Sequence, residues 1–337
     1  MPEPRTRVTV FENNSEKSNT EDFMRRIIPA ALVAVSLSIS LPARAEQFVN
    51  VLTGGTSGVY YPLGVALSNI YGKIPEVKAS VQATKASVEN LNLLSQGRGE
   101  IGFTLGDSLS QAWDGNEEVG FKAKQDKLRS IAGIYPNYIQ IVAAADSGIK
   151  TLADLKGKKI SVGAPKSGTE LNARAIFAAA GMTYKDFARV EYLPFGESVD
   201  LMKNRQIDAT LQSAGLGVAS IRDLSNSVSI VIVPIPMETI TKVGDPAYIA
   251  AIIPAGTYGG QTADVPTAAV QNFLVTHAGV SDQLAYDMTK GLFENLDQLQ
   301  AAHAAAKAIA LTEAAVKSPV PLHPGAAKYY REKGLLK

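Results

Sequence analysis

Short apolar runs typical of buried β-strands alternate with amphipathic helical segments through most of this chain. Helices are expected around residues 60–73, 87–97, 108–115, 151–156, 170–181, 197–204 and 216–225. The runs predicted as strands are FVNVLTG, VKASVQAT, IGFTLG, LRSIAGIY, IQIVAAA, KISVGA, RVEYLPF, DATLQSA, VSIVIVPIP and YIAAIIP. This alternation predicts an α/β fold with mostly parallel sheets. The 337 residues are enough for two domains.

The C-terminal part of the chain has a different pattern. From Pro266 onward we predict no strand, only Ala-rich helices. These helices are expected to break at Gly279-Val280-Ser281, where Ser281 is a suitable N-cap residue.

The first 45 residues have the features of an export signal. Arg25 and Arg26 precede an apolar run from Ile27 to Leu41, and Ala43-Arg44-Ala45 follows. The run, about 15 residues long, is too short for a bilayer span, which needs roughly 20. We predict a cleavable signal over residues 1–45, cut after Ala45. Residues 1–23 are a candidate mis-called extension, with Met24 as the alternative start.

Composition narrows the class of protein further. With 46% hydrophobic and 19% charged residues, the chain is typical of a soluble globular protein. After residue 45 the basic and acidic residues are interspersed and balanced, so we predict no nucleic-acid partner. The chain has no cysteine, which excludes disulfides, thiol catalysis and cysteine-bound metals.

Two segments share one construction, FVNVLTGGTSGVYYPLGVAL and KKISVGAPKSGTELNARAIFAAAG. Each reads as a strand, a loop rich in Gly, Ser and Thr, and a helix closed by Gly72 or Gly181. Loops at the carboxyl ends of strands bind ligands in α/β sheets, and helix N-termini attract anions. The repeated construction therefore predicts two lobes that face one ligand across a cleft.

Other chemistries fit the sequence less well. The first loop gives neither G-x-G-x-x-G nor a P-loop. Gly106-Asp107-Ser108-Leu109 matches the GDSL of a hydrolase family, but no acid stands three residues before any of the three histidines. Asp107 and Ser108 are therefore expected to cap the next helix or to touch ligand. The scattered histidines predict no metal site.

The candidate cleft residues have hydroxyl or amide side chains: Thr56, Ser57, Tyr60, Thr84, Ser87, Asn90, Ser167, Thr169, Gln212 and Ser213. They provide no pair of nucleophile and base, so we predict binding without catalytic residues, metal or cofactor. For some of them, a turn or capping role without ligand stays open.

Six segments stand in this order along the chain: TGGTSGVYYPLGVAL, ATKASVENLNLLSQGRGEIGF, SGIKTLADLKGKKISVGAPKSGTELNA, QIDATLQSAG, AGTYGGQTADVPT and PLHPGAAKYYREKG. Together they resemble the TAXI-type receptors of tripartite ATP-independent periplasmic (TRAP) transporters. The resemblance implies a two-lobed, type II-like periplasmic binding protein with C-terminal helices. Lobe 1 would be residues 46–137 plus 250–337 and lobe 2 residues 138–249, with hinge strands near YPNYIQIV and PAYIAAI.

The resemblance also implies a function. The chain would be a monomeric periplasmic receptor, not an enzyme, that closes on a small carboxylate such as glutamate, glutamine, 2-oxoglutarate or another organic acid. It would deliver the solute to a TRAP membrane permease without ATP or cofactor. A periplasmic ligand-sensing module is the alternative, and an exported GDSL-like hydrolase is a second one.

The ligand contacts that the resemblance implies come from five places: Gly55, Thr56, Ser57 and Tyr60; Thr84, Ser87 and Asn90; Asn137 and Tyr138; Ser167, Gly168 and Thr169; Gln212, Ser213 and Gly215. Asp208 is expected to cap a turn or orient a strand, and His323 to be structural. No arginine stands at a cleft position, and Arg98 is expected to be exposed, so backbone N–H groups and hydroxyls would hold an anion. At least two of Tyr60, Tyr61, Tyr135 and Tyr138 are expected in the core.

Overall fold

The computed structural model describes residues 46–315 and 318–337. The predicted export signal over residues 1–45, with its cleavage after Ala45, lies outside the described residues. Within them the strands are β1 (Gln47–Leu52), β2 (Val77–Gln82), β3 (Ile101–Leu105), β4 (Leu128–Ala144), β5 (Lys159–Ser161), β6 (Arg189–Glu191), β7 (Ala209–Ala214), β8 (Ile230–Val233), β9 (Tyr248–Ile253) and β10 (Val265–His277).

The α-helices between them are α1 (Tyr60–Tyr71), α2 (Ser87–Ser95), α3 (Gly106–Asp114), α4 (Gly168–Ala179), α5 (Phe195–Lys203), α6 (Ala219–Ser227), α7 (Met237–Val243), α8 (Asp282–Glu294), α9 (Leu296–Ala302), α10 (Leu311–Ala314) and α11 (Pro324–Glu332). The 3₁₀ helices are η1 (Glu117–Val119), η2 (Ala145–Ser147), η3 (Ala153–Leu155), η4 (Tyr184–Asp186) and η5 (Ala304–Ala308). Most predicted segments correspond to these elements. The predicted helix near 151–156 is the 3₁₀ helix η3, α7 was not predicted, and β4 and β10 differ from the prediction as described below.

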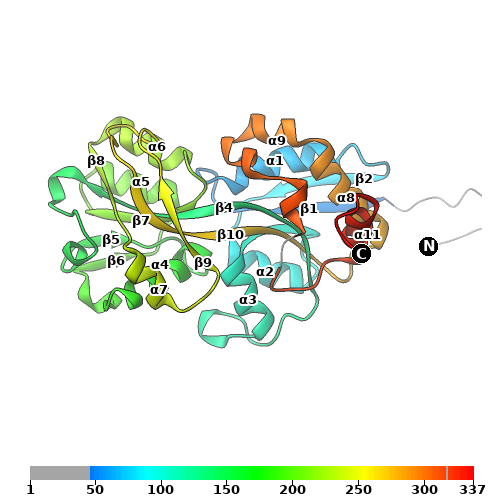
Figure 1. The fold of residues 1–337 in the computed structure, drawn as a ribbon, viewed down its shortest axis with the longest axis horizontal. Helices are drawn as coiled ribbons and strands as arrows, with labels where there is room; N and C mark the ends of the chain where they lie inside the picture. Colours follow the sequence, from blue (N-terminus) through cyan, green and yellow to red (C-terminus); the bar gives the residue numbers. More distant parts are fainter. Residues whose placement is uncertain (1–45, 316–317) are drawn as a thin grey trace, which may run out of the picture. The chain divides into compact units, whose positions relative to one another are not determined.

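The strands form two halves that β4 and β10 connect (Figure 1). The order is β2-β1-β3-β10-β4-β7-β5-β6, with β8 paired to β4 and β9 paired to β10. One end of β10 pairs with β3 and the other with β9, while β4 pairs with β10 up to Tyr138 and with β7 from Tyr138 onward. The two long strands therefore join a lobe containing β1–β3 to a lobe containing β5–β9.

The prediction of mostly parallel sheets is only partly right. Within the lobes, β1 pairs in parallel with β2 and β3, and β5 with β6 and β7. Every pairing of β4 or β10 with another of these strands is antiparallel. The sheet is mixed because the chain crosses between the lobes twice, in opposite directions.

The prediction that no strand follows Pro266 is wrong, because Val265–His277 is the 13-residue strand β10. This strand lies inside the sheet, and most of its residues are buried. Burial on both faces removes the alternation that marks a strand, and pairing with three neighbours overrides the helix propensity of its alanines. The helix prediction after it is confirmed: α8 follows Ser281, whose Oγ accepts a hydrogen bond from Leu284 N at 3.2 Å.

The two runs LRSIAGIY and IQIVAAA belong to one 17-residue strand, β4. They look separate because Pro136 lies between them, and proline cannot donate a ladder hydrogen bond. The pairing with β10 shifts register near this proline, between Gln271 and Phe273. The second predicted hinge strand, PAYIAAI, corresponds to β9, which pairs only with β10 among the described strands.

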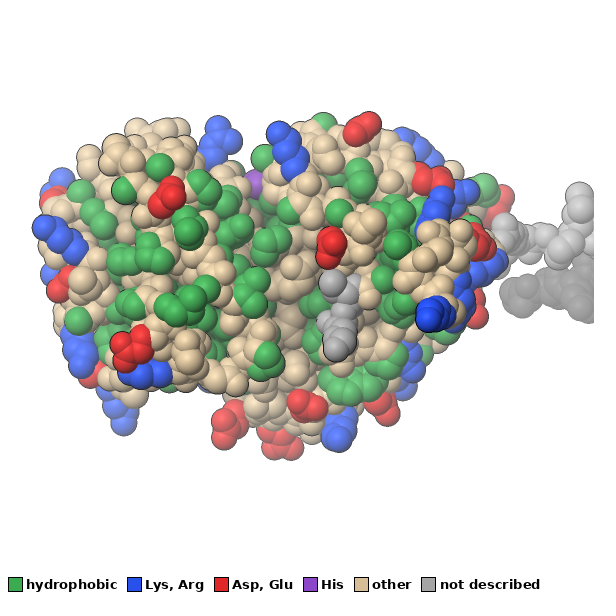
Figure 2. Space-filling view, in the orientation of Figure 1, with side chains coloured by type: hydrophobic (Ala, Val, Ile, Leu, Met, Phe, Trp, Pro, Cys, Tyr) green, Lys and Arg blue, Asp and Glu red, His purple; other side chains and the backbone are tan. Residues whose placement is uncertain are grey.

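The surface carries charges of both signs. On the face drawn in Figure 2, basic and acidic side chains are interspersed and lie mainly along the outer edges. None of the helices within residues 46–315 and 318–337 is both long and apolar enough to cross a bilayer. The same residues contain no cluster of three or more His, Asp or Glu side chains placed to hold a metal ion.

Candidate ligand-binding cleft

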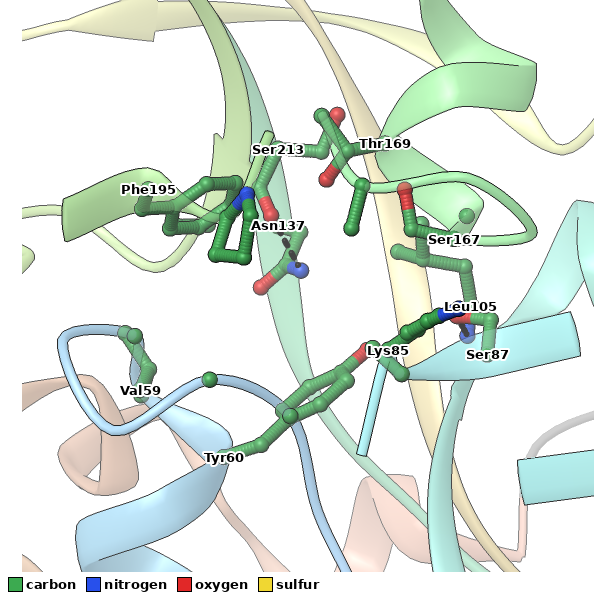
Figure 3. A pocket seen from close by; sticks show the side chains of 18 of the residues that line it. Val59, Tyr60, Lys85, Ser87, Leu105, Asn137, Ser167, Thr169, Phe195 and Ser213 are labelled. Carbon is green, nitrogen blue, oxygen red and sulfur yellow. Dashed lines mark hydrogen bonds between the residues drawn. The ribbon is translucent and has the colours of Figure 1, made fainter. Parts of the chain in front are cut away.

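A cavity of about 80 Å³ lies between the two lobes. Figure 3 shows Tyr60, Ser87 and Leu105 on one side, Ser167, Thr169, Ser213 and Phe195 on the other, and Asn137 between them. Nine of the predicted site residues line it: Gly55, Tyr60, Thr84, Ser87, Asn137, Ser167, Gly168, Thr169 and Ser213. The other lining residues are Gly54, Gly58, Val59, Lys85, Ala86, Leu105, Ala164, Pro194, Phe195 and Ala214.

Four helices begin at this cavity. Tyr60, Ser87, Gly168 and Phe195 line it, and they are the first residues of α1, α2, α4 and α5. The first N–H groups of a helix have no partner within the helix, and that end carries a partial positive charge. The convergence makes the cavity suited to an anionic group.

The backbone is strained next to two of these helix starts. Ala86, before α2, has φ 69° and ψ −149°, and Lys166, just before the α4 N-cap, has φ 61°. Residues other than glycine rarely adopt positive φ, and such strain is often found at ligand sites. Hydrogen bonds support the loop before α2: Thr84 Oγ1 accepts from Ala86 N at 2.9 Å, and Asn90 Nδ2 donates to Thr53 O at 2.7 Å.

The start of α4 has a side-chain cap and lies close to the other lobe. Ser167 Oγ accepts a hydrogen bond from Glu170 N at 3.1 Å. A Cβ at Gly168 would lie 2.6 Å from Ser87 Oγ and 2.6 Å from Leu105 Cδ1. Only glycine allows this approach, so the two lobes are closed on each other here.

A chain of hydrogen bonds crosses the floor of the cleft. Tyr60 OH donates to Asn272 Oδ1 at 2.5 Å, Asn272 Nδ2 donates to Asn137 Oδ1 at 2.8 Å, and Asn137 Nδ2 donates to Ser213 O at 3.0 Å. The chain links α1, β10, β4 and β7. Sequence reasoning missed Asn272 because its segment was predicted as helix. The signal that could have found it was the pair of amides Gln271 and Asn272 inside a mostly apolar run.

Ser213 has a free hydroxyl at the cavity. Its side chain is 5% exposed, and its Oγ has no hydrogen-bond partner among the described residues. Its neighbour Gln212 points to the other side of β7, where Gln212 Oε1 accepts from Ser220 Oγ at 2.6 Å. Gln212 Nε2 also has no hydrogen-bond partner among the described residues, but only Ser213 of the two lines the cavity, so Ser213 Oγ is the one placed to meet a bound solute.

Six predicted site residues do not line the cavity: Thr56, Ser57, Asn90, Tyr138, Gln212 and Gly215. Thr56 is exposed, and Ser57 lies beside Gly196 of the other lobe. Asn90 is held by its hydrogen bond to Thr53 O and supports the backbone before α2. Gly215 packs against Ala305, where a Cβ would come within 2.7 Å, and Tyr138 packs against a hydrophobic core.

Several predictions about individual side chains are confirmed. Tyr60 and Tyr135 are buried, and the ring of Tyr60 stacks on Phe103 at 4.9 Å. Arg98 is exposed. Asp208 Oδ2 accepts from Lys159 N at 2.8 Å, so it orients β5. The buried His323 bonds Val280 O through Nε2 at 3.0 Å and accepts from Gly325 N.

The Gly106–Leu109 segment begins α3 and contains a buried carboxyl group. Asp107 Oδ2 accepts hydrogen bonds from Asn172 Nδ2 at 2.6 Å and Tyr248 OH at 2.8 Å, while its Oδ1 accepts from Ser108 N at 2.6 Å. The pKa of Asp107 is raised from 3.8 to about 6, chiefly because burial disfavours the charged form, while the hydrogen bonds from Tyr248 and Ser108 oppose the shift.

The three histidines bond within other segments. His277 accepts from Gly279 N, and His303 accepts from Ala305 N, each at 3.1 Å. His323 is hydrogen-bonded at the start of α11. Among the described residues, no hydrogen bond joins any of these imidazoles to Ser108. Asp107 and Ser108 therefore serve the helix start and the contact between lobes.

Comparisons with known proteins agree on the fold. A family model described as the NMT1-like family matches residues 51–334. The periplasmic binding protein BugD is similar at 10% identity and TM-score 0.56, over 87% of this chain and 95% of that one. A periplasmic transporter is similar at 10% identity and TM-score 0.53, over 83% and 91%. A protein from Bordetella bronchiseptica RB50 has 17% identity and TM-score 0.50, over 87% and 91%. The fold is that of a two-lobed periplasmic binding protein.

Proposed function

The chain belongs to the NMT1-like family, and from this premise and the cleft we propose that it is an extracytoplasmic solute-binding receptor. The observation that carries the proposal is the closed cavity between the lobes at which four helices begin. Helix starts and hydroxyl groups hold an anion without a catalytic pair. The solute is a small carboxylate, with glutamate, glutamine, 2-oxoglutarate and other organic acids as the candidates.

Binding works through lobe closure. A solute that touches Ser87 of one lobe and Ser167, Thr169 and Ser213 of the other has all its contacts only when the lobes are together. It therefore favours the closed state by the difference in its affinity for the two states. The sharing of the cavity between the lobes supports this step.

We propose β4 and β10 as the hinge. The expected boundary between residues 137 and 138 is supported by the change of partner along β4, from β10 to β7, at Tyr138. The expected boundary near residue 250 is better placed within β10. Residues 265–270 of β10 pair with β9, and residues 272–275 pair with β3 of the other lobe. Lobe 2 would then extend through β9.

The partner in this proposal is a TRAP permease that takes the solute from the monomeric receptor. The sequence segments that resemble TAXI receptors support it, and residues 1–45 would direct export to the periplasm. The proposal needs no ATP and no cofactor. A sensing module would use the same cleft, and a neighbouring gene for a multi-span permease or for a kinase would decide between the two.

A thermal-shift screen of residues 46–337 tests the proposal. The library should contain amino acids, dicarboxylates, oxo acids and aromatic acids. A ligand at about 100 times its Kd adds roughly 2.7 kcal/mol to the stability of the protein. We expect at least one carboxylate to raise Tm, and a flat response to all of them would contradict the proposal.

A further inference from the structure

The cavity has an uneven distribution of charge. Lys85 is the only charged side chain among the described residues that line it, and none of those residues is Asp or Glu. The four helix starts add partial positive charge. The cavity therefore attracts anions and has no carboxylate with which to bind a cation.

Among the described residues, no acidic side chain at the neighbouring helix starts lines the cavity. Glu197, in the first turn of α5, is exposed, and the other three are hydrogen-bonded within the protein. Glu170, in the first turn of α4, is 3% exposed and bonds Arg174 Nε at 2.6 Å and Tyr184 OH at 3.0 Å. Glu89, in the first turn of α2, accepts from Lys85 N at 2.6 Å. Asp107 is held by Asn172 and Tyr248. These three carboxylates do not line the cavity.

The rest of the wall is apolar or neutral. Val59, Leu105, Ala164, Phe195 and Ala214 offer nonpolar surface, and Ser213 Oγ is a buried polar atom without a hydrogen-bond partner among the described residues. An ammonium group placed here would lose its water without gaining an opposite charge. A hydroxyl or oxo group would instead find a neutral hydroxyl able to bond it.

We infer that this receptor takes small carboxylates without an amino group and discriminates against the corresponding amino acids. The inference rests on the proposed function and narrows it. Within the candidates above it favours the oxo acids, hydroxy acids and unsubstituted acids over glutamate and glutamine. The cavity would discriminate against amino acids because its positive groups, the helix starts and Lys85, attract a carboxylate, while no Asp or Glu among the described residues lines it to bind an ammonium group.

The test compares acids that share a carbon skeleton. Pyruvate and lactate are matched with alanine, 2-oxoisovalerate with valine, and 2-oxoglutarate with glutamate, by thermal shift and then by titration calorimetry. In every pair that binds, the acid without nitrogen should bind at least tenfold tighter. An amino acid that binds as tightly or more tightly would overturn this inference and leave the receptor function standing. If no carboxylate of any kind binds, both fall.

A charge variant adds an independent measurement. Lys85 is exposed, so Lys85→Gln should fold, and its unliganded Tm checks this. The variant should reduce the preference for the oxo acid over its amino acid by roughly twofold to fivefold, since a partly solvated charge is screened. Lys122→Gln is the matched control, because Lys122 is exposed and does not line the cavity. A preference that is unchanged in Lys85→Gln, or reduced equally in the control, would contradict the role of this charge.

Discussion

Asn172 Nδ2 donates a hydrogen bond of 2.6 Å to Asp107 Oδ2, and this bond joins the two lobes. Tyr248 OH donates to the same oxygen at 2.8 Å. Asp107 lies at the start of α3 in one lobe, while Asn172 on α4 and Tyr248 on β9 belong to the other. Nearby, Leu171 packs into the core that contains α2 and α3 residues, and Leu105 packs into the core of the opposite lobe. This interface exists only when the lobes are closed.

Closure should be linked to proton uptake at Asp107. Its pKa is raised to about 6 in the closed state, chiefly because burial disfavours the charge, and the Asp245 carboxylate adds to this. In an open state the carboxyl group would regain water and its pKa would fall toward 3.8. A group whose pKa is higher in the closed state favours that state as the pH falls, so ligand affinity should rise by about tenfold between pH 7.5 and pH 5.

Calorimetry at the two pH values, in buffers with different ionisation enthalpies, measures both the affinity and the proton uptake. Asp107→Asn is the matched control, because it removes the titration and keeps the shape of the side chain. Affinity that is equal or weaker at pH 5, or a pH dependence that persists in the variant, would contradict the linkage.

Gly168→Ala should block closure without unfolding either lobe. The new methyl group would lie 2.6 Å from Ser87 Oγ and from Leu105 Cδ1, atoms of the opposite lobe. We expect the unliganded Tm to stay within a few degrees of the parent and ligand affinity to fall by at least tenfold. Titration calorimetry with the best ligand from the screen checks this, and parental affinity would show that the lobes need not come this close.

Ser213→Ala should separate binding from stability. Ser213 Oγ has no protein partner among the described residues, so its removal should not lower the unliganded Tm. Loss of one hydrogen bond to the solute should weaken binding roughly fivefold to tenfold. Thr56→Ala is the control, because Thr56 is exposed and does not line the cavity. Equal effects of the two variants on affinity would remove Ser213 from the site.

Tyr60→Phe should destabilise the protein by about 1–3 kcal/mol, because it leaves the buried Asn272 Oδ1 without its donor. The comparison is Tyr61→Phe, at a half-buried neighbour on the same helix. Urea unfolding of the unliganded variants measures the difference. A Tyr60→Phe value no larger than that of Tyr61→Phe would show that the hydrogen-bond chain contributes little to stability.

The sequence predicted the local features of the cleft well. The two loop-and-helix segments, with Gly55 in the first loop and Gly168 at the start of the second helix, do meet at one cavity. Such segments are recognisable because serine and threonine before a helix cap its first N–H groups, and glycine lets a ligand approach the backbone there. The direction of single side chains was harder to predict: Thr56 and Ser57 carry the same hydroxyl as Ser167, yet they do not line the cavity.

Features that depend on distant pairing were missed. β10 resembles a helix in sequence, and only its pairing with β3, β4 and β9 makes it a strand. Asn272 therefore could not be placed beside Tyr60, 212 residues away in the chain. The contact of Asp107 with Asn172 likewise depends on how the lobes close, which no local pattern encodes.

The distance between the lobes, measured with and without solute, tests the central claim most directly. The chain has no cysteine, so Lys122→Cys in one lobe and Lys242→Cys in the other introduce two unique labelling sites at exposed positions. Spin-label distances should be longer and broader without solute. They should become shorter and narrower with a saturating carboxylate, but not in Gly168→Ala. A distance distribution that stays the same while calorimetry shows binding would contradict capture by lobe closure.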